Sequence, residues 1–176
     1  MDDKLPSPEA REAALYDRFR SLGIAWKTFE HVPVFTVAEA DAVHDSVPGC
    51  HTKNLFLKDK KGGLWLIVVR DRLRVDLNAL ARQLGAPRFS FGSAELLIAT
   101  LGIEPGSVTP FALINDTENR VTVVLDAGML RTDPLNFHPM RNDRTTAISP
   151  EALLTFVRAS GHEPLIAELP EIVKTP

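Results

Sequence analysis

Apolar and polar residues recur along this chain in two periods, which predict interspersed helices and strands. A period of three to four residues follows a serine, threonine or aspartate cap in five segments, and each is a predicted helix. The helices are expected at about 8–22, from Thr36 onward, and at 76–85, 93–102 and 149–161. The first has proline after its serine cap, and the second opens with the capping box Thr36-x-x-Glu39.

Apolar runs with strand-like composition separate these helices. Residues 53–59 and 64–70 flank the turn sequence KKGG and predict a β-hairpin. Strands are also expected at 24–31, at 111–116 and 120–126 joined by a polar turn, and in a short run that contains His138. Residues 162–169 fit a last strand or a tail. The mixture predicts an α/β (α+β) fold: a single compact domain over residues 1–176, with a central mixed sheet and flanking helices.

Composition is consistent with this prediction and also indicates the cellular compartment. The chain has 176 residues, of which 44% are hydrophobic and 24% charged, as in ordinary soluble domains. With one cysteine it can form no internal disulfide, which fits a reducing compartment. The acidic, polar N-terminus is not a signal peptide, and no apolar run approaches the roughly 20 residues that span a bilayer. We therefore expect a cytoplasmic protein with no membrane partner.

Charge is distributed unevenly along the chain. The net charge is −3, but residues 53–88 hold nine lysines and arginines against three acids, a local charge of +6. The other residues carry 11 basic and 20 acidic side chains, a charge of −9. This basic segment fits either a surface that faces phosphates or a solvated hairpin.

Most familiar catalytic patterns are absent from the sequence. Cys50 and His51 are adjacent on an extended segment, so their side chains point to opposite faces and cannot easily act as a dyad. The five histidines show no metal-ligand spacing, and neither a hydrolase elbow nor a phosphate-binding loop is present. We expect no metal and no cofactor.

Three other segments carry candidate chemistry. Lys53 begins a strand and shares a face with Leu55 and Leu57, where a lysine is costly to bury unless it meets an anion or extends its charged end into water. Gly106 and Pro110 bracket a loop whose free N–H groups could face a carbonyl or carboxylate. His138 lies among apolar residues, where a lone histidine is usually structural.

Together these segments resemble the YbaK-like family of aminoacyl-tRNA deacylases. The resemblance rests on Lys53-Asn54 at the head of a strand, on "GSVTP", and on "NFHPMRNDRTTAIS", and it runs from about Phe29 to Gly161. The chain is most similar to the free-standing editing proteins that deacylate alanyl-tRNA(Pro). The resemblance implies a hydrolase with no metal, no cofactor and no covalent intermediate, in which a 2′-hydroxyl of the terminal ribose helps to activate water.

The resemblance also implies roles for residues of this chain. Lys53, Gly106 and His138 are the implied catalytic residues: Lys53 contacts the 3′-terminal phosphate or sugar, the Gly106 loop orients the ester carbonyl, and His138 bounds the pocket. Substrate binding is expected from Asn54, Ser107, Val108, Thr109, Pro110, Asn142 and Thr145. The basic segment supplies the expected tRNA contacts, Lys58, Lys60, Lys61, Arg70, Arg72 and Arg74.

The expected partners are the acceptor end of mischarged tRNA(Pro) and a prolyl-tRNA synthetase, and not DNA. Two alternatives stay open on the sequence alone. One is a module that binds aminoacyl-tRNA or a synthetase without hydrolysis. The other is a deacylase for cysteine or serine on tRNA(Pro).

Overall fold

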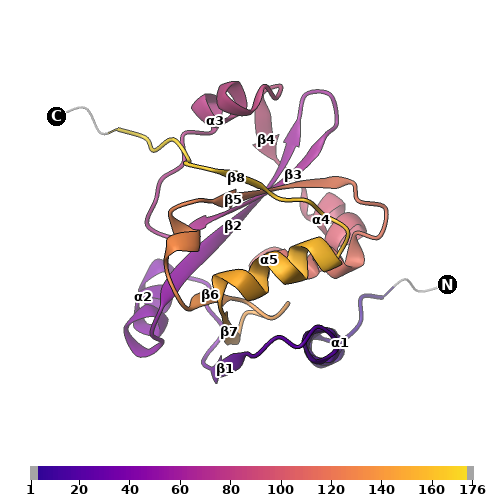
Figure 1. The fold of residues 1–176 in the computed structure, drawn as a ribbon, viewed down its shortest axis with the longest axis vertical. Helices are drawn as coiled ribbons and strands as arrows, with labels where there is room; N and C mark the ends of the chain where they lie inside the picture. The colour runs from indigo at the N-terminus through magenta and orange to yellow at the C-terminus, as the bar shows by residue number, and fades with distance from the viewer. Residues whose placement is uncertain (1–3, 174–176) are drawn as a thin grey trace.

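A computed structural model of the protein describes residues 4–173 as a mixed sheet with helices on both faces (Figure 1). The helices are α1 (Pro8–Ser21), α2 (Val37–Ser46), α3 (Leu77–Leu84), α4 (Ala94–Leu101) and α5 (Pro150–Ala159), with 3₁₀ turns η1 (Pro110–Asn115) and η2 (Met129–Arg131). The strands are β1 (Lys27–Glu30), β2 (Cys50–Asp59), β3 (Leu64–Arg70), β4 (Phe89–Phe91), β5 (Val121–Asp126), β6 (Leu135–Phe137), β7 (Arg144–Ile148) and β8 (Leu165–Ala167). The predicted fold class is confirmed.

The sheet has the strand order β1-β7-β6-β2-β3-β5-β8, with β4 beside β2. The hairpin β2–β3 is antiparallel, as predicted, and β6, β5 and β8 join the sheet in parallel pairs. β1 and β7 complete one end as antiparallel strands. Strands from both halves of the chain therefore meet in the middle of the sheet.

The five predicted helices begin at their predicted caps. The side chains of Ser7, Thr36, Asp76, Ser93 and Ser149 each accept a hydrogen bond from a backbone N–H in the first turn of the helix that follows. The capping box of α2 forms in full, since Glu39 also accepts from the backbone N–H of Thr36 at 3.0 Å.

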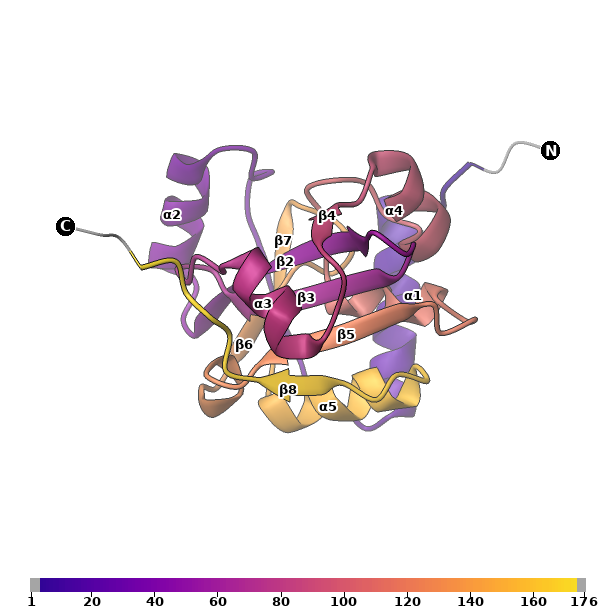
Figure 2. The same ribbon diagram turned by 90° about the horizontal axis from the view of Figure 1, so that it is seen from above.

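β3 lies in the middle of the sheet and has apolar side chains on both faces, each of which is covered by a hydrophobic core. Leu64, Leu66 and Val68 face the larger core, which α1, α4, α5 and η1 cover. Ile67 and Val69 face a smaller core under α3. Figure 2 shows α3 on the opposite face from α5, while α2 stands at the margin of the fold. Val43 is the one buried residue of α2.

Two local predictions are wrong. Residues 111–116 do not form a strand: Pro110–Asn115 form the 3₁₀ turn η1, at whose start the Thr109 hydroxyl accepts from the backbone N–H of Phe111. Burying Phe111, Ala112 and Leu113 inside the larger core explains the apolar run equally well. β5 consequently pairs with β3 and β8 and not with this segment. His138 lies just after β6 and not within it.

β2 changes partners along one of its edges. One edge pairs with β3 from Thr52 to Lys58. On the other edge, Cys50 and His51 pair with β6, whereas residues 57–59 pair with β4. Lys53 and Asn54 lie between these partners, where no strand in the described part of the chain pairs with β2 on that edge. This interruption leaves room for a cavity in the middle of the sheet.

Within residues 4–173, no helix combines the length and apolar character that crossing a membrane requires.

Candidate active site

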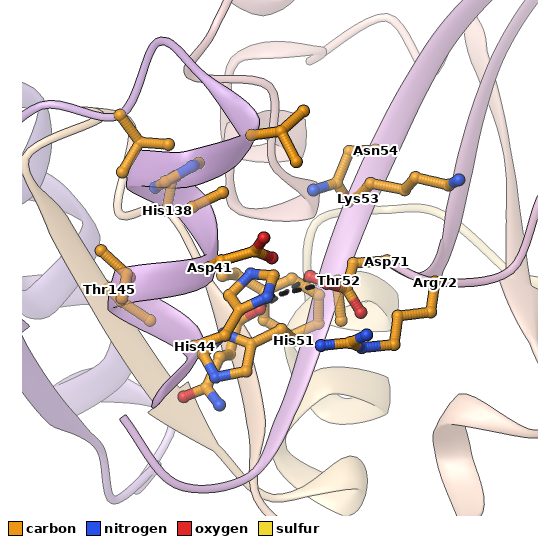
Figure 3. Close-up of a pocket in the computed structure, with 16 residues that line it drawn as sticks. Asp41, His44, His51, Thr52, Lys53, Asn54, Asp71, Arg72, His138 and Thr145 are labelled. Atoms are coloured by element: carbon orange, nitrogen blue, oxygen red, sulfur yellow. Dashed lines mark hydrogen bonds and ion pairs between the residues drawn. The ribbon is translucent and has the colours of Figure 1, made fainter. Parts of the chain in front are cut away.

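A cavity of about 490 Å³ lies between α2 and the interrupted edge of β2 (Figure 3). It is lined by residues of α2, by 51–54 of β2, by Asp71 and Arg72 after β3, by 136–138 of the β6 segment, and by Thr145 of β7. The structure therefore brings together five of the predicted site residues. They are Lys53, Asn54, Arg72, His138 and Thr145.

Lys53 stands on the β2 side of the cavity with its charge only partly solvated. Burial lowers the pKa of Lys53 below its ordinary value, Arg74 lowers it further, and Asp71 opposes both. Among the described residues no carboxylate lies within ion-pair distance of Lys53. A partly desolvated lysine without a counterion favours an anionic ligand, and the role of Lys53 in substrate binding stays a prediction.

His138 lies across the cavity from Lys53 (Figure 3). Its Nδ1 donates to the backbone carbonyl of Arg144 at 3.1 Å. Burial lowers the pKa of His138 below 6.5, and the nearby ring of His31 lowers it further. The imidazole is therefore neutral at neutral pH, and its Nε2 has a free lone pair.

A histidine pair that the sequence did not predict lies at the base of the cavity. The rings of His44 and His51 stack with centroids 4.1 Å apart. His44 Nδ1 lies 3.0 Å from a carboxylate oxygen of Asp71, and His51 Nε2 donates to the carbonyl of Val47 at 2.8 Å. Burial lowers the pKa of His51. These contacts connect α2 and its C-cap residue Val47 to His51 at the start of β2 and to Asp71 after β3.

The cavity face of α2 was visible in the sequence but was not recognised. Val37, Ala40, Asp41 and His44 all line the cavity and are spaced i, i+3, i+4 and i+7. That spacing is the ordinary inward stripe of a helix, here with an aspartate and a histidine in it. A polar pair inside an apolar stripe could have identified Asp41 and His44 as site residues.

Several predicted site residues lie outside the lining of this cavity. Ser107 and Asn142 line a separate depression of about 430 Å³, beside Phe35 and Arg141. Val108 packs against the larger core, and Thr109 and Pro110 are buried where η1 begins. Gly106 has φ of +92°, and no atom lies within 4 Å of the place where a Cβ would stand. The substrate-binding role of the Gly106–Pro110 loop and of Asn142 stays a prediction.

The predicted tRNA-contacting residues lie in two exposed groups, and Arg70 belongs to neither. Lys58, Lys60 and Lys61 are exposed around the tip of the β2–β3 hairpin. At about 3.3 Å per residue, this tip lies roughly 20 Å along β2 from Lys53. Arg72 and Arg74 are exposed at the opposite end, by the cavity. Arg70 is held by the fully buried Asp126, with its Nε 2.7 Å from a carboxylate oxygen.

Cys50 does not face the cavity. It packs against the larger core while His51 lines the cavity, so the two side chains lie on opposite sides of β2, as their adjacency predicted. Burial raises the pKa of the Cys50 thiol, which therefore carries little thiolate at neutral pH. Neither property suits a nucleophile.

Comparisons with known proteins place this fold and site in a class. The structure superposes on the crystal structure of a protein proposed to be a trans-editing enzyme for prolyl tRNA synthetase. The TM-score is 0.70 at 23% identity, over 94% of this chain and 99% of that one, which establishes the shared fold. Residues 31–156 match the model of the aminoacyl-tRNA editing domain.

The chain belongs to this aminoacyl-tRNA editing family, the YbaK-like family that its three motifs resemble. It is 41% identical to "Prolyl-tRNA synthetase associated domain-containing protein 1" of Bos taurus, over 88% of this chain and 92% of the relative. It is 32% identical to "Prolyl-tRNA editing protein ProX" of Acetoanaerobium sticklandii, over 88% and 94% of the two chains. The protein is an aminoacyl-tRNA deacylase, and its substrate is a tRNA.

Proposed function

We propose that this deacylase removes alanine wrongly attached to tRNA(Pro) and releases alanine and free tRNA(Pro). The observation that carries the proposal is a cavity of about 490 Å³ with an unpaired Lys53 on one side and a neutral His138 on the other. The names of two relatives, one a prolyl-tRNA editing protein and one associated with prolyl-tRNA synthetase, support proline as the cognate amino acid. The proposed partners are the acceptor end of tRNA(Pro) and a prolyl-tRNA synthetase.

The proposed mechanism needs no nucleophile from the protein. Water adds to the ester carbonyl carbon, the bond from that carbon to the ribose oxygen breaks, and the proton of the water passes to the ribose oxygen. A 2′-hydroxyl of the terminal ribose helps to activate the water. Lys53 holds the terminal phosphate or sugar, so that the protein contributes mainly position and polarisation. The position of Cys50 outside the cavity supports this assignment.

A second site for alanine has a thermodynamic reason. An activating site sized for proline cannot strongly reject a smaller amino acid, because each missing methylene is worth only about 1–3 kcal/mol. A second site that admits alanine and excludes proline by size corrects this error as a fine sieve. In this proposal His138 forms part of the wall that limits size.

A deacylation panel tests the proposed function. Purified protein is incubated with alanyl-, cysteinyl-, seryl- and prolyl-tRNA(Pro), and the remaining ester is measured against buffer alone. We expect rapid loss of alanyl-tRNA(Pro) and no loss of prolyl-tRNA(Pro). Preferential loss of the cysteinyl or seryl ester would contradict the proposed specificity for alanine. Binding without hydrolysis of any ester would contradict the proposed function.

A further inference from the structure

Hydrogen bonds behind the cavity wall determine which way the Thr145 hydroxyl points. His31 Nδ1 lies 2.8 Å from the backbone carbonyl of Val32, which can only accept, so Nδ1 carries the proton. In the neutral ring His31 Nε2 is then an acceptor, and it lies 2.9 Å from Thr145 Oγ1. With His31 in this neutral form, the Thr145 hydroxyl donates to His31 and keeps its oxygen lone pairs for a ligand.

His138 has the same polarity on the same side of the cavity. Its Nδ1 donates to the carbonyl of Arg144, so the neutral ring offers only the lone pair of Nε2. Among the described residues no protein group donates to this nitrogen. The wall thus holds two fixed acceptors, Thr145 Oγ1 and His138 Nε2, and Asp41 on α2 adds a carboxylate that faces the cavity (Figure 3).

The two sides of the cavity differ in charge. Figure 3 shows His138 and Thr145 on one side, and Lys53, Arg72 and Asp71 on the other, where the Asp71 carboxylate lies 3.0 Å from His44. Acceptors on one side fit a cationic donor, whereas cations on the other fit a phosphate. An aminoacyl ester at the end of a tRNA has both groups, because its α-ammonium is a few bonds from the ribose and its phosphate is just beyond the ribose.

We propose that Thr145 Oγ1 and His138 Nε2 bind the α-ammonium group of the aminoacyl ester. We further assign His31, which does not line the cavity, as a positioning residue that keeps the Thr145 hydroxyl turned to accept. This inference rests on the proposed function, since it names the part of the substrate that this wall recognises. Sites built to hydrogen-bond a substrate N–H discriminate strongly against analogues that lack it.

The test compares two esters that differ only in this group. Alanyl-tRNA(Pro) and lactyl-tRNA(Pro) have the same shape, but lactate has a hydroxyl in place of the ammonium. Each kcat/KM is divided by the uncatalysed hydrolysis rate of the same ester, which removes the activating effect of the ammonium on the ester itself. We expect the corrected alanyl-to-lactyl ratio of the unaltered protein to be about tenfold or more.

Three variants show whether the named residues produce the ratio. Thr145→Val removes the hydroxyl at nearly constant volume, and His31→Phe removes the acceptor behind it. Both should lower the corrected ratio several-fold, whereas a purely structural defect would slow both esters alike. Thr146→Val is the matched control, because Thr146 is equally buried but bonds to Tyr16 and Thr28 on the other face of β7. It should leave the ratio unchanged.

The outcomes separate this inference from the function beneath it. Hydrolysis of both esters at equal corrected rates would overturn the inference and leave the proposed function standing. A ratio that stays the same in Thr145→Val and His31→Phe would also overturn it. If Thr145→Val does not fold, His31→Phe decides alone, since His31 is only partly buried. Hydrolysis of neither ester would overturn the proposed function and the inference together.

Discussion

Lys53 is the residue on which the proposed chemistry depends most. A charge-assisted hydrogen bond from its ammonium to a phosphate or ribose oxygen is worth roughly 1.5–3 kcal/mol. We expect Lys53→Ala to lower kcat/KM for alanyl-tRNA(Pro) about tenfold or more. The melting temperature should not fall, because the substitution removes a partly desolvated charge that has no protein counterion. Unchanged activity in the Lys53→Ala protein would contradict the proposed role of Lys53 in substrate binding.

Cys50→Ser is the matched control for this experiment. Cys50 is three residues from Lys53 on the same strand, but it faces the larger core, and burial raises the pKa of its thiol. The serine variant should therefore keep most of the activity. A folded but inactive Cys50→Ser protein would instead indicate a thiol mechanism.

His138 should give the reaction a distinct pH dependence. Its pKa is lowered from 6.5 by burial, with His31 adding to the shift and the Arg144 carbonyl and Asp143 opposing it. The neutral ring therefore persists as pH falls to about 6.5, and the imidazolium forms only at lower pH. Protonated Nε2 can no longer accept, so kcat/KM should fall below about pH 6.5.

A pH series of the unaltered protein and of His138→Gln measures this dependence. The fall below about pH 6.5 should be absent or displaced in His138→Gln, which has no titrating group at this position. The folded state should also lose stability in the same range, because the unfolded chain binds a proton to this histidine at higher pH than the folded chain does. Melting temperatures at each pH therefore accompany the rates. The same inflection in both proteins would assign it to a group other than His138.

At the scale of elements, the hairpin β2–β3 separates binding from chemistry. Its exposed lysines lie around a tip roughly 20 Å from Lys53, too far to touch the ester. We expect Lys60→Glu/Lys61→Glu to weaken tRNA binding and to flatten the dependence of log affinity on log salt, while turnover at saturating substrate stays nearly unchanged. Binding measured at several salt concentrations, with Arg20→Glu on α1 as control, tests this. An unchanged salt slope would place the tRNA surface elsewhere.

The predicted helices were located correctly where a local capping signal marks their first residue. A capping side chain followed by proline correctly located the starts of α1 and α5. The same pattern occurs at Thr109-Pro110, but the apolar run after it was interpreted as a strand, and η1 was missed. Short apolar runs do not distinguish strands from buried helical turns, and here the cap was the better signal.

At the scale of the whole molecule, the sequence predicted one half of the cavity better than the other. The motifs identified Lys53, Asn54, His138 and Thr145, and these residues do converge. His31 and Asp71 were missed because their roles depend on partners far away in the chain, Thr145 for His31 and His44 for Asp71. No local pattern predicts that β6 pairs in parallel with β2, and this pairing is what brings His138 opposite Lys53.

The distribution of ion pairs also appears only in the folded molecule. Arg11, Arg141 and Arg144, near α1, are each paired with a glutamate or an aspartate. Lys58, Lys60 and Lys61 of the hairpin are exposed, as are Arg72 and Arg74 after β3, so these cations are accessible to a polyanion. The local charge of +6 counted along the sequence is therefore divided in the folded molecule between the hairpin tip and the segment after β3, while Arg70 is paired with Asp126.

The interrupted edge of β2 has a consequence for deuterium exchange. The backbone of His51 bonds to Asp71 and that of Asp59 to Gly63, so the odd-numbered residues of β2 direct their amides toward β3. Asn54 directs its amide the other way, into the gap between β4 and β6. Its N–H should exchange like that of an exposed loop, whereas its neighbours Lys53 and Leu55 exchange orders of magnitude more slowly.

Residue-resolved exchange followed by NMR would show this contrast in the free protein. Equal protection of the three amides would mean that the gap is closed in solution. If the contrast is present, the one fast amide within an otherwise protected strand marks the unpaired edge of β2 that borders the cavity. The exchange rate of the Asn54 amide then reports the binding of a ligand in the cavity, without the need for ester hydrolysis.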